Sequence, residues 1–240
     1  MLGVEALTRP DPESGLTGPA EAFDVAEQIG CVRALDMLCV GHARQITPEL
    51  PDGALLFVNL SPQTLDLDSD GNDWFCDAVK RAGLAPDRVV VEVTERFGGR
   101  SAAILATVRR LRAHGFKIAI DDVGTGNSGL EMLRTIQAEY VKIDRSIVVA
   151  AAGDPSARAV LMAMATYARM TGSFVIAEGI EELDTLDFLR AVEDSDTLHE
   201  HVIQGGQGYG LGRPHPHVPQ QLPTLLRDAI TWHPILGVKS

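Results

Sequence analysis

The chain has 240 residues, of which 45% are hydrophobic and 22% are charged, and its formal net charge is −12. This length suits one (β/α)8 barrel, for which about 250 residues is typical, or two small domains. The acidic balance argues against general binding to DNA, RNA or an anionic membrane, because each of these needs a basic surface.

Targeting and redox features are few. No run of 18 apolar residues occurs, so we expect no membrane insertion, and the N-terminus lacks the basic and apolar regions of a signal peptide. The three cysteines, Cys31, Cys39 and Cys76, form no CxxC pair, which argues against a disulfide framework or a zinc site. We therefore expect a cytoplasmic protein, or the cytoplasmic part of a larger, membrane-attached protein.

Short apolar runs rich in Val and Ile recur along the chain and predict buried parallel strands. In chain order, the expected strands are 3–7, 54–60, 88–94, 116–121, 139–143, 173–178 and a weaker one at 202–207.

Longer amphipathic segments lie between these runs and predict helices. The expected helices are 19–46, 72–82, 100–114, 128–136, 155–171, 182–192 and 219–231. Residues 193–206 are polar and predict a long loop. Regular alternation of strands and helices predicts a parallel sheet, open or closed, and seven strands are one fewer than an eightfold barrel needs.

Polar side chains recur at or just after the C-terminal end of every expected strand. They are Glu5, Asn59, Glu92 with Glu95, Asp121 with Asp122, Lys142 with Asp144, Glu178 with Glu181, and Gln207. In an α/β barrel these strand ends converge on one mouth, where catalysis takes place.

A single acidic residue after a strand is more often a helix N-cap or a solvated loop residue, and Glu95 or Glu181 alone would be read that way. The pair Asp121–Asp122 is harder to explain so, because adjacent carboxylates repel unless a cation lies between them. Asn59 and Glu92 stand in apolar runs, where an uncompensated polar group is costly to bury. Carboxylate and amide oxygens are hard donors, which favours Mg²⁺, Mn²⁺ or Ca²⁺.

Seven ordered motifs carry a family resemblance. They are Glu5-Ala6-Leu7-Thr8-Arg9, Val58-Asn59-Leu60-Ser61, Glu92-Val93-Thr94-Glu95, Asp121-Asp122-Val123-Gly124-Thr125-Gly126, Lys142-Ile143-Asp144-Arg145, Ala177-Glu178-Gly179-Ile180-Glu181 and Gln207-Gly208-Tyr209. In order and spacing the chain resembles the EAL-domain phosphodiesterases of cyclic di-GMP over roughly residues 3 to 214. Seven motifs in order are far more specific than any one of them.

The resemblance implies a modified TIM-type (β/α)8 barrel whose first strand, antiparallel to the rest, is the one absent from the count above. It implies an EAL domain over 1–232, truncated at its N-terminus relative to the family, and a C-terminal tail over 233–240. The ligands it implies for two Mg²⁺ or Mn²⁺ ions are Glu5, Asn59, Glu92, Asp121, Asp122 and Glu178.

The resemblance also implies roles around these ions. Lys142 would orient the attacking water, with Asp144 in support, and Glu95 would hold the loop at 122–129. Arg9 would contact a substrate phosphate, while Glu181 and Gln207 would lie at the periphery of the site.

The activity implied is hydrolysis of cyclic di-GMP to the linear dinucleotide pGpG. Two ions would activate a water that attacks phosphorus in line and expels a 3′ oxygen. A homodimer is expected from the family, and a sensor or cyclase domain upstream of this chain is compatible with it.

The chain departs from the family pattern at Pro10, where Trp is frequent, and at Val123, Asn127 and Gly129, where Phe, an aromatic residue and Ser are usual. These departures keep a second class open: a catalytically weak or inactive EAL domain that serves as a cyclic di-GMP receptor or protein-interaction module. A third class, a TIM-barrel metalloenzyme acting on a sugar phosphate or carboxylate, would share the acidic mouth but would not explain the ordered motifs.

Overall fold

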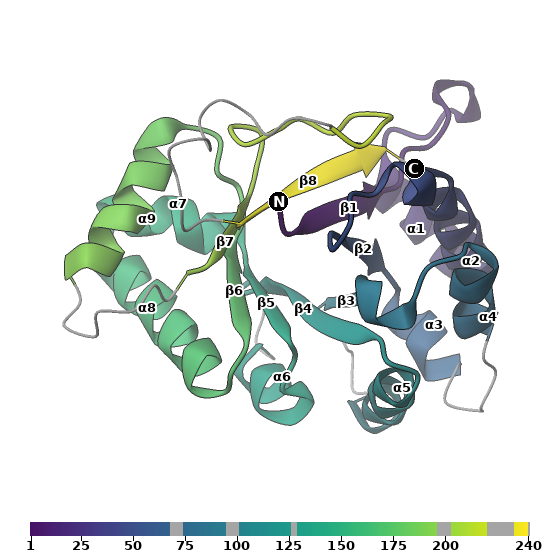
Figure 1. The fold of residues 1–240 in the computed structure, drawn as a ribbon, viewed down its shortest axis with the longest axis horizontal. Coiled ribbons are helices and arrows are strands. Elements are labelled where there is room, and N and C mark those ends of the chain that lie inside the picture. The colour runs from purple at the N-terminus through teal and green to yellow at the C-terminus, as the bar shows by residue number, and fades with distance from the viewer. Residues whose placement is uncertain (68–73, 95–100, 126–128, 196–202, 220–232, 240) are drawn as a thin grey trace.

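A computed structural model describes residues 1–67, 74–94, 101–125, 129–195, 203–219 and 233–239 (Figure 1). Within these ranges no helix has both the length and the apolar character needed to cross a bilayer.

Eight strands form a closed barrel in which every pairing of the described strands is parallel. Each strand lies beside its neighbour in sequence, and the last closes against the first (Figure 1). The strands are β1 (Gly3–Leu7), β2 (Leu55–Asn59), β3 (Val89–Thr94), β4 (Lys117–Val123), β5 (Tyr140–Ile143), β6 (Phe174–Ala177), β7 (Gly205–Gln207) and β8 (His233–Lys239). The predicted α/β barrel is therefore confirmed, and all seven expected strands are present.

Helices cover most of the outer face of the barrel, on the left, below and on the right in Figure 1. They are α1 (Pro19–Gln28), α2 (Val32–Ala43), α3 (Pro62–Leu67), α4 (Trp74–Arg81), α5 (Ser101–Ala113), α6 (Gly129–Ile136), α7 (Arg145–Gly153), α8 (Pro155–Met170) and α9 (Leu183–Ser195). The short helices α3 and α7 were not expected from the sequence. The helix expected at 219–231 lies outside the described residues apart from its first position.

The single helix expected over 19–46 is two helices, because α1 ends in a Schellman motif. Gly30 adopts φ of 72°, and its N–H and that of Cys31 donate to the carbonyls of Glu27 and Ala26. The chain then turns and α2 runs back beside α1 (Figure 1). The polar loop expected at 193–206 is shorter than predicted, since α9 continues to Ser195 and β7 begins at Gly205.

The eighth strand comes from the C-terminal end of the chain. Residues 233–239, expected to be a tail, pair with β1 on one side and with β7 on the other. The apolar residues 235–238 are buried in the barrel wall. This parallel strand therefore closes the barrel between β7 and β1, and the eight strands described here include no antiparallel one.

Two layers of side chains fill the barrel along its axis. The lower layer is a separate apolar cluster made by Leu55, Phe57, Val90, Ala119, Tyr140, Ile176 and Ile235. Side chains two positions further along a strand point to the same face. The next layer toward the mouth therefore contains polar residues, Asn59, Glu92, Asp121, Lys142 and Glu178, each two positions after a member of the apolar cluster.

Candidate active site at the barrel mouth

Lys142 of β5 lies at the centre of the mouth with four carboxylates around it. Its Nζ is 2.9 Å from Glu92 Oε1, 3.0 Å from Asp121 Oδ1, 2.9 Å from Glu178 Oε1 and 3.5 Å from Glu5 Oε2. The lysine side chain is 1% exposed. Residues 137 positions apart in the chain are thus joined in one buried ionic cluster.

Two amides complete the cluster on the side of β1. Asn59 Nδ2 donates to Glu5 Oε1 at 2.9 Å, and Gln207 Nε2 donates to Glu5 Oε2. Gln207 therefore contacts a central carboxylate directly, whereas the resemblance implied a peripheral place. The barrel geometry explains this contact, because β8, which lies between β7 and β1, has the glycine Gly237 opposite Glu5.

Asp121 and Asp122 both face the mouth, although adjacent residues of a regular strand point to opposite faces. The β4–β5 register shifts between Ile120 and Val123, and Asp122 has φ of 57°. This bulge places Asp122 with Asp121 and Glu178, so that carboxylate oxygens of the three lie within 4.8 Å of one another. Positive φ at a non-glycine residue is uncommon and often marks a functional site.

Burial and mutual repulsion shift the titration of this cluster. Burial raises the pKa of Glu178 to about 8, against the attraction of Lys142 and with added repulsion from Asp121. Burial and repulsion from Glu5 hold the pKa of Glu92 well above its usual range. Burial also acts to raise the pKa of Glu5, but Lys142 and the hydrogen bonds from the two amides outweigh it, so that this pKa is lowered.

The donor set fits divalent metal ions. Glu92 Oε2 and Gln207 Oε1 are buried and accept no hydrogen bond from the described residues. Buried polar atoms are normally satisfied, so these two oxygens, on residues that contact Lys142 and Glu5, fit coordination to a cation. Carboxylate and amide oxygens are the donors that Mg²⁺, Mn²⁺ and Ca²⁺ prefer.

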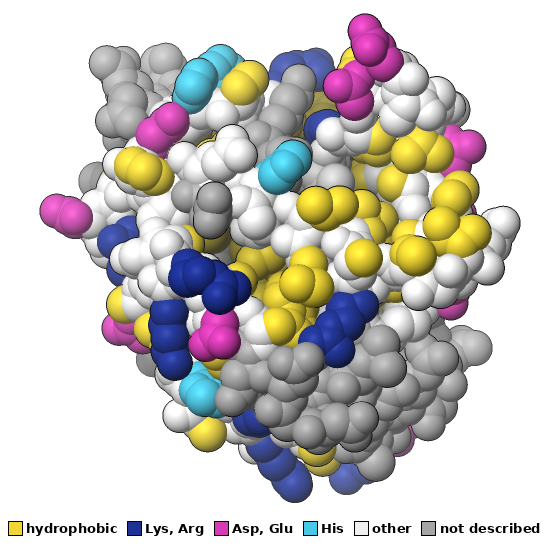
Figure 2. Space-filling model, turned by 90° about the vertical axis from the view of Figure 1, so that its right-hand side faces the viewer, with side chains coloured by type: hydrophobic (Ala, Val, Ile, Leu, Met, Phe, Trp, Pro, Cys, Tyr) yellow, Lys and Arg dark blue, Asp and Glu magenta, His cyan; other side chains and the backbone are white. Residues whose placement is uncertain are grey.

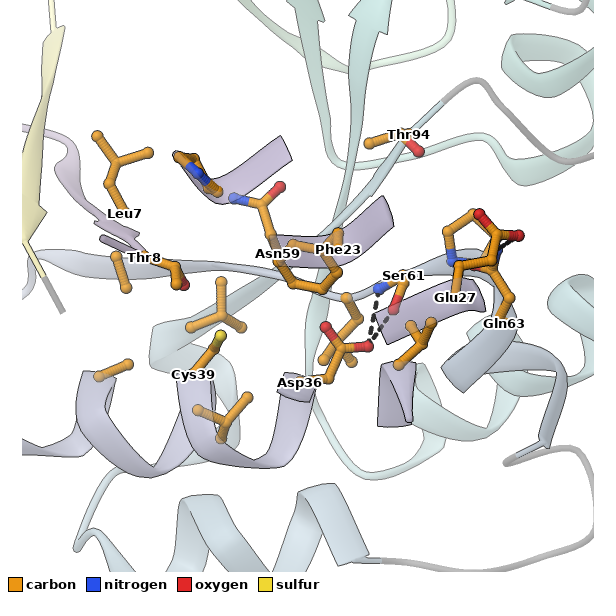
Figure 3. A pocket seen from close by; sticks show the side chains of 18 of the residues that line it. Leu7, Thr8, Phe23, Glu27, Asp36, Cys39, Asn59, Ser61, Gln63 and Thr94 are labelled. Carbon is orange, nitrogen blue, oxygen red and sulfur yellow. Dashed lines mark hydrogen bonds between the residues drawn. The ribbon is translucent and has the colours of Figure 1, made fainter. Parts of the chain in front are cut away.

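A pocket of about 530 Å³ opens beside the acidic cluster and shares Asn59 and Asp122 with it. Its walls come from the ends of β1 and β2 and from α1 and α2 (Figure 3). On the molecular face that carries these helices, hydrophobic side chains gather between groups of Lys and Arg (Figure 2). The pocket therefore offers an apolar wall next to Asn59 and Asp122 at the edge of the mouth.

Hydrogen bonds join the pocket's helices to the segment that follows β2. Asp36 of α2 is fully buried and accepts from the N–H of Ser61 at 3.1 Å and from its hydroxyl. Gln63 Nε2 donates to Glu27 Oε1 of α1 at 2.8 Å (Figure 3). These contacts fix α2 against the connection that follows β2, and α1 against α3.

Arg9, Asn59 and Asp122 were predicted from the sequence but the pocket residues on α1 and α2 were not, although the spacing of these helical residues was a usable signal. Pro19, Phe23 and Glu27 recur every four residues and therefore lie on one face of α1. Asp36, Cys39 and other lining residues of α2 follow the same helical period. An amphipathic helix normally turns its apolar face to the core, so the pattern alone did not distinguish a pocket wall from core packing.

The remaining expected site residues lie further out. Arg9 is exposed at the pocket edge, where its Nη1 donates to the carbonyl of Thr8 at 2.7 Å. Glu181 is 2.8 Å from Arg145 in an exposed ion pair. Glu95 lies outside the described residues.

Asp144 is the N-cap of α7. Its Oδ1 accepts from the N–H of Ser146 at 2.8 Å. The described residues give it no hydrogen bond or ion pair with Lys142, so its support for that lysine stays a prediction.

Comparison with known proteins identifies a family for this chain. The EAL domain family model matches residues 1–195. The probable cyclic di-GMP phosphodiesterase PdeG of Escherichia coli is 31% identical over 222 residues, which are 89% of this chain and 41% of that protein. The chain thus spans less than half the length of this curated relative, and 37% of the Pseudomonas aeruginosa cyclic di-GMP phosphodiesterase PA2567.

Two solved structures extend the likeness to three dimensions. The PaMucR phosphodiesterase in complex with c-di-GMP has a TM-score of 0.67 and 30% identity, over 80% of each chain. The Klebsiella pneumoniae BlrP1 manganese and cy-diGMP complex at pH 9.0 has a TM-score of 0.61 and 28% identity, over 73% of this chain and 45% of the other. With the family model matching most of its length, this chain belongs to the EAL domain family.

Proposed function

We propose that this chain hydrolyses one phosphodiester of cyclic di-GMP, with two divalent metal ions, to give linear pGpG. The observation that carries the proposal is the buried cluster of carboxylates around Lys142, which opens at Asn59 and Asp122 onto a pocket of about 530 Å³. The c-di-GMP complexes of PaMucR and BlrP1 support the choice of substrate.

The metal ions would be held by Glu5, Asn59, Glu92, Asp121, Asp122 and Glu178. Together with Lys142, the five carboxylates carry a formal charge of −4 when all are ionised, which two divalent ions would balance. When bound, two ions lower the pKa of water and neutralise charge that develops on the phosphate. The manganese and calcium complexes of BlrP1 support a divalent ion.

Lys142 would orient the water for in-line attack, because its ammonium lies among the carboxylates that would bind the ions. In the reaction, the water oxygen forms a new bond to phosphorus and the bond to the 3′ oxygen breaks. A proton from the water ends on that 3′ oxygen, so the product keeps a 5′ phosphate. Arg9, exposed at the edge of the pocket, would contact the phosphate.

The pocket would hold a nucleobase of the substrate. Its volume lies in the range of small-molecule sites, about 300–1,000 Å³. Phe23 and Pro19 give it an apolar wall, and Glu27, Gln63 and Asp36 give it polar groups (Figure 3). Aromatic faces stack on bases, and nearby carboxylates accept from their N–H groups.

The test is incubation of the purified chain with cyclic di-GMP and Mn²⁺ or Mg²⁺, followed by chromatography of the products. We expect pGpG to appear with the metal and to be absent with EDTA. Binding without turnover would instead favour the receptor class. The absence of both binding and turnover would contradict the proposal.

Homodimerisation, an upstream sensor or cyclase domain and a cytoplasmic location are further proposals that rest on family membership. Light scattering on the purified chain tests the first, since a monomeric mass at working concentration would contradict it.

A further inference from the structure

Lys142 Nζ lies within 3.5 Å of one oxygen from each of four carboxylates. Three of these carboxylates are in β1, β3 and β4, and the fourth, Glu178, directly follows β6. With its own strand β5, the lysine thus links five of the eight strands across the mouth. It is the one basic side chain that the ion pairs of the described residues bring to this cluster.

The carboxylates have little access to water. Glu92 is fully buried, Glu5 is 4% exposed and Asp121 is 8% exposed. Charges in such a place are stable only when paired, and removing one partner of a buried ion pair is strongly destabilising. The four carboxylates would repel one another without the ammonium, so the barrel mouth depends on a positive charge at this point.

The same carboxylates are the metal ligands of the proposed function. A cation at Nζ therefore attracts the ligand oxygens that a metal ion would use, and it repels the metal ion itself.

We propose that Lys142 is an internal counter-ion that stabilises the barrel mouth without metal and competes with divalent ions for its carboxylates, so that it sets the affinity of the site. This inference rests on the proposed function only in taking the mouth as the metal site. It assigns to Lys142 a role separate from orienting water.

The experiment compares thermal unfolding of the wild-type chain and Lys142→Met in EDTA and in a Mn²⁺ titration. In EDTA we expect the variant to melt lower by roughly 10 °C, from the usual effect of breaking a buried ion pair in a domain of this size. Mn²⁺ should recover most of this loss and should bind the variant more tightly by calorimetry. Lys80→Met, which removes an exposed lysine of α4, should melt like the wild type in both conditions.

Equal melting of Lys142→Met and wild type in EDTA would overturn the proposal, as would weaker Mn²⁺ binding by the variant. Neither readout needs turnover. A chain that hydrolyses nothing can therefore still pass this test, and an active enzyme can still fail it.

A second variant keeps the test open if Lys142→Met does not fold. Four carboxylates share one ammonium, so Glu92→Gln should leave the melting temperature in EDTA unchanged or raise it. The double variant Lys142→Met/Glu92→Gln should be more stable than Lys142→Met alone, because one repelling charge is gone. A large fall in EDTA for Glu92→Gln alone would contradict the counter-ion role.

Discussion

The two layers inside the barrel are formed by side chains two residues apart on the same strands, and they differ in polarity, in charge and in how they affect stability. On β5, Tyr140 belongs to the apolar layer and Lys142 to the ionic one, and on β3 Val90 and Glu92 stand in the same relation. The lower layer gains stability from packing, with the rings of Phe57 and Tyr140 in edge-to-face contact at 5.5 Å. The upper layer gathers like charges that burial penalises. One period-2 pattern therefore yields both the core and the site.

The largest effect should follow a change in the ionic layer that leaves the apolar layer alone. Asp121→Ala removes a proposed ligand that also contacts Lys142 at 3.0 Å. We expect turnover of cyclic di-GMP to be abolished while the far-ultraviolet circular dichroism spectrum is retained. Residual hydrolysis near the wild-type rate would remove Asp121 from the metal site.

The reciprocal change is in the apolar layer. Phe57→Ala should lower the free energy of unfolding by about 3–5 kcal/mol, as is usual for a fully buried phenylalanine. Urea denaturation measures this loss. A loss below about 1 kcal/mol would mean that the lower layer does not hold the barrel together as its packing indicates.

A smaller effect is expected at the pocket, outside both layers. Phe23→Ala should raise KM for cyclic di-GMP by roughly 10-fold with little change in kcat, since base stacking is worth about 1–3 kcal/mol. Val25→Ala, at an exposed position of the same helix, is the matched control. If the two variants have equal KM values, the base does not stack on Phe23.

The smallest effect concerns Asp144, the N-cap of α7. Asp144→Ala should lower the free energy of unfolding by about 1 kcal/mol, while Asp144→Asn should keep the cap and the stability. Denaturation measures the difference between the two variants. Equal free energies of unfolding for Asp144→Ala and Asp144→Asn would show that the Asp144 side chain does not stabilise α7 by capping.

The strands and the polar residues of the mouth could be predicted because one signal, a short apolar run that ends in a polar side chain, marks both. The eighth strand was not predicted because Pro234 and Gly237 interrupt its short apolar run within a strand of only seven residues. Proline and glycine normally argue against a strand interior.

The site could be predicted as a set of residue types but not as an arrangement. Nothing in the adjacent letters Asp121–Asp122 indicates the bulge that turns both side chains inward. The contact of Gln207 with Glu5 likewise depends on β8 lying between their strands, and the sequence pattern predicts no strand there.

The position of β8 also bears on how the molecule assembles. β1 pairs on one side with a strand that lies more than 200 residues further along the chain, from Gly3 to Ile235. During synthesis β1 has an open edge until residues 233–239 have been made, and contacts of such long sequence separation form slowly. The carboxylate of Glu5 therefore reaches its final surroundings only after β8 has been synthesised, so a chain that stops before residue 233 would expose an unpaired edge of β1, which is prone to aggregation.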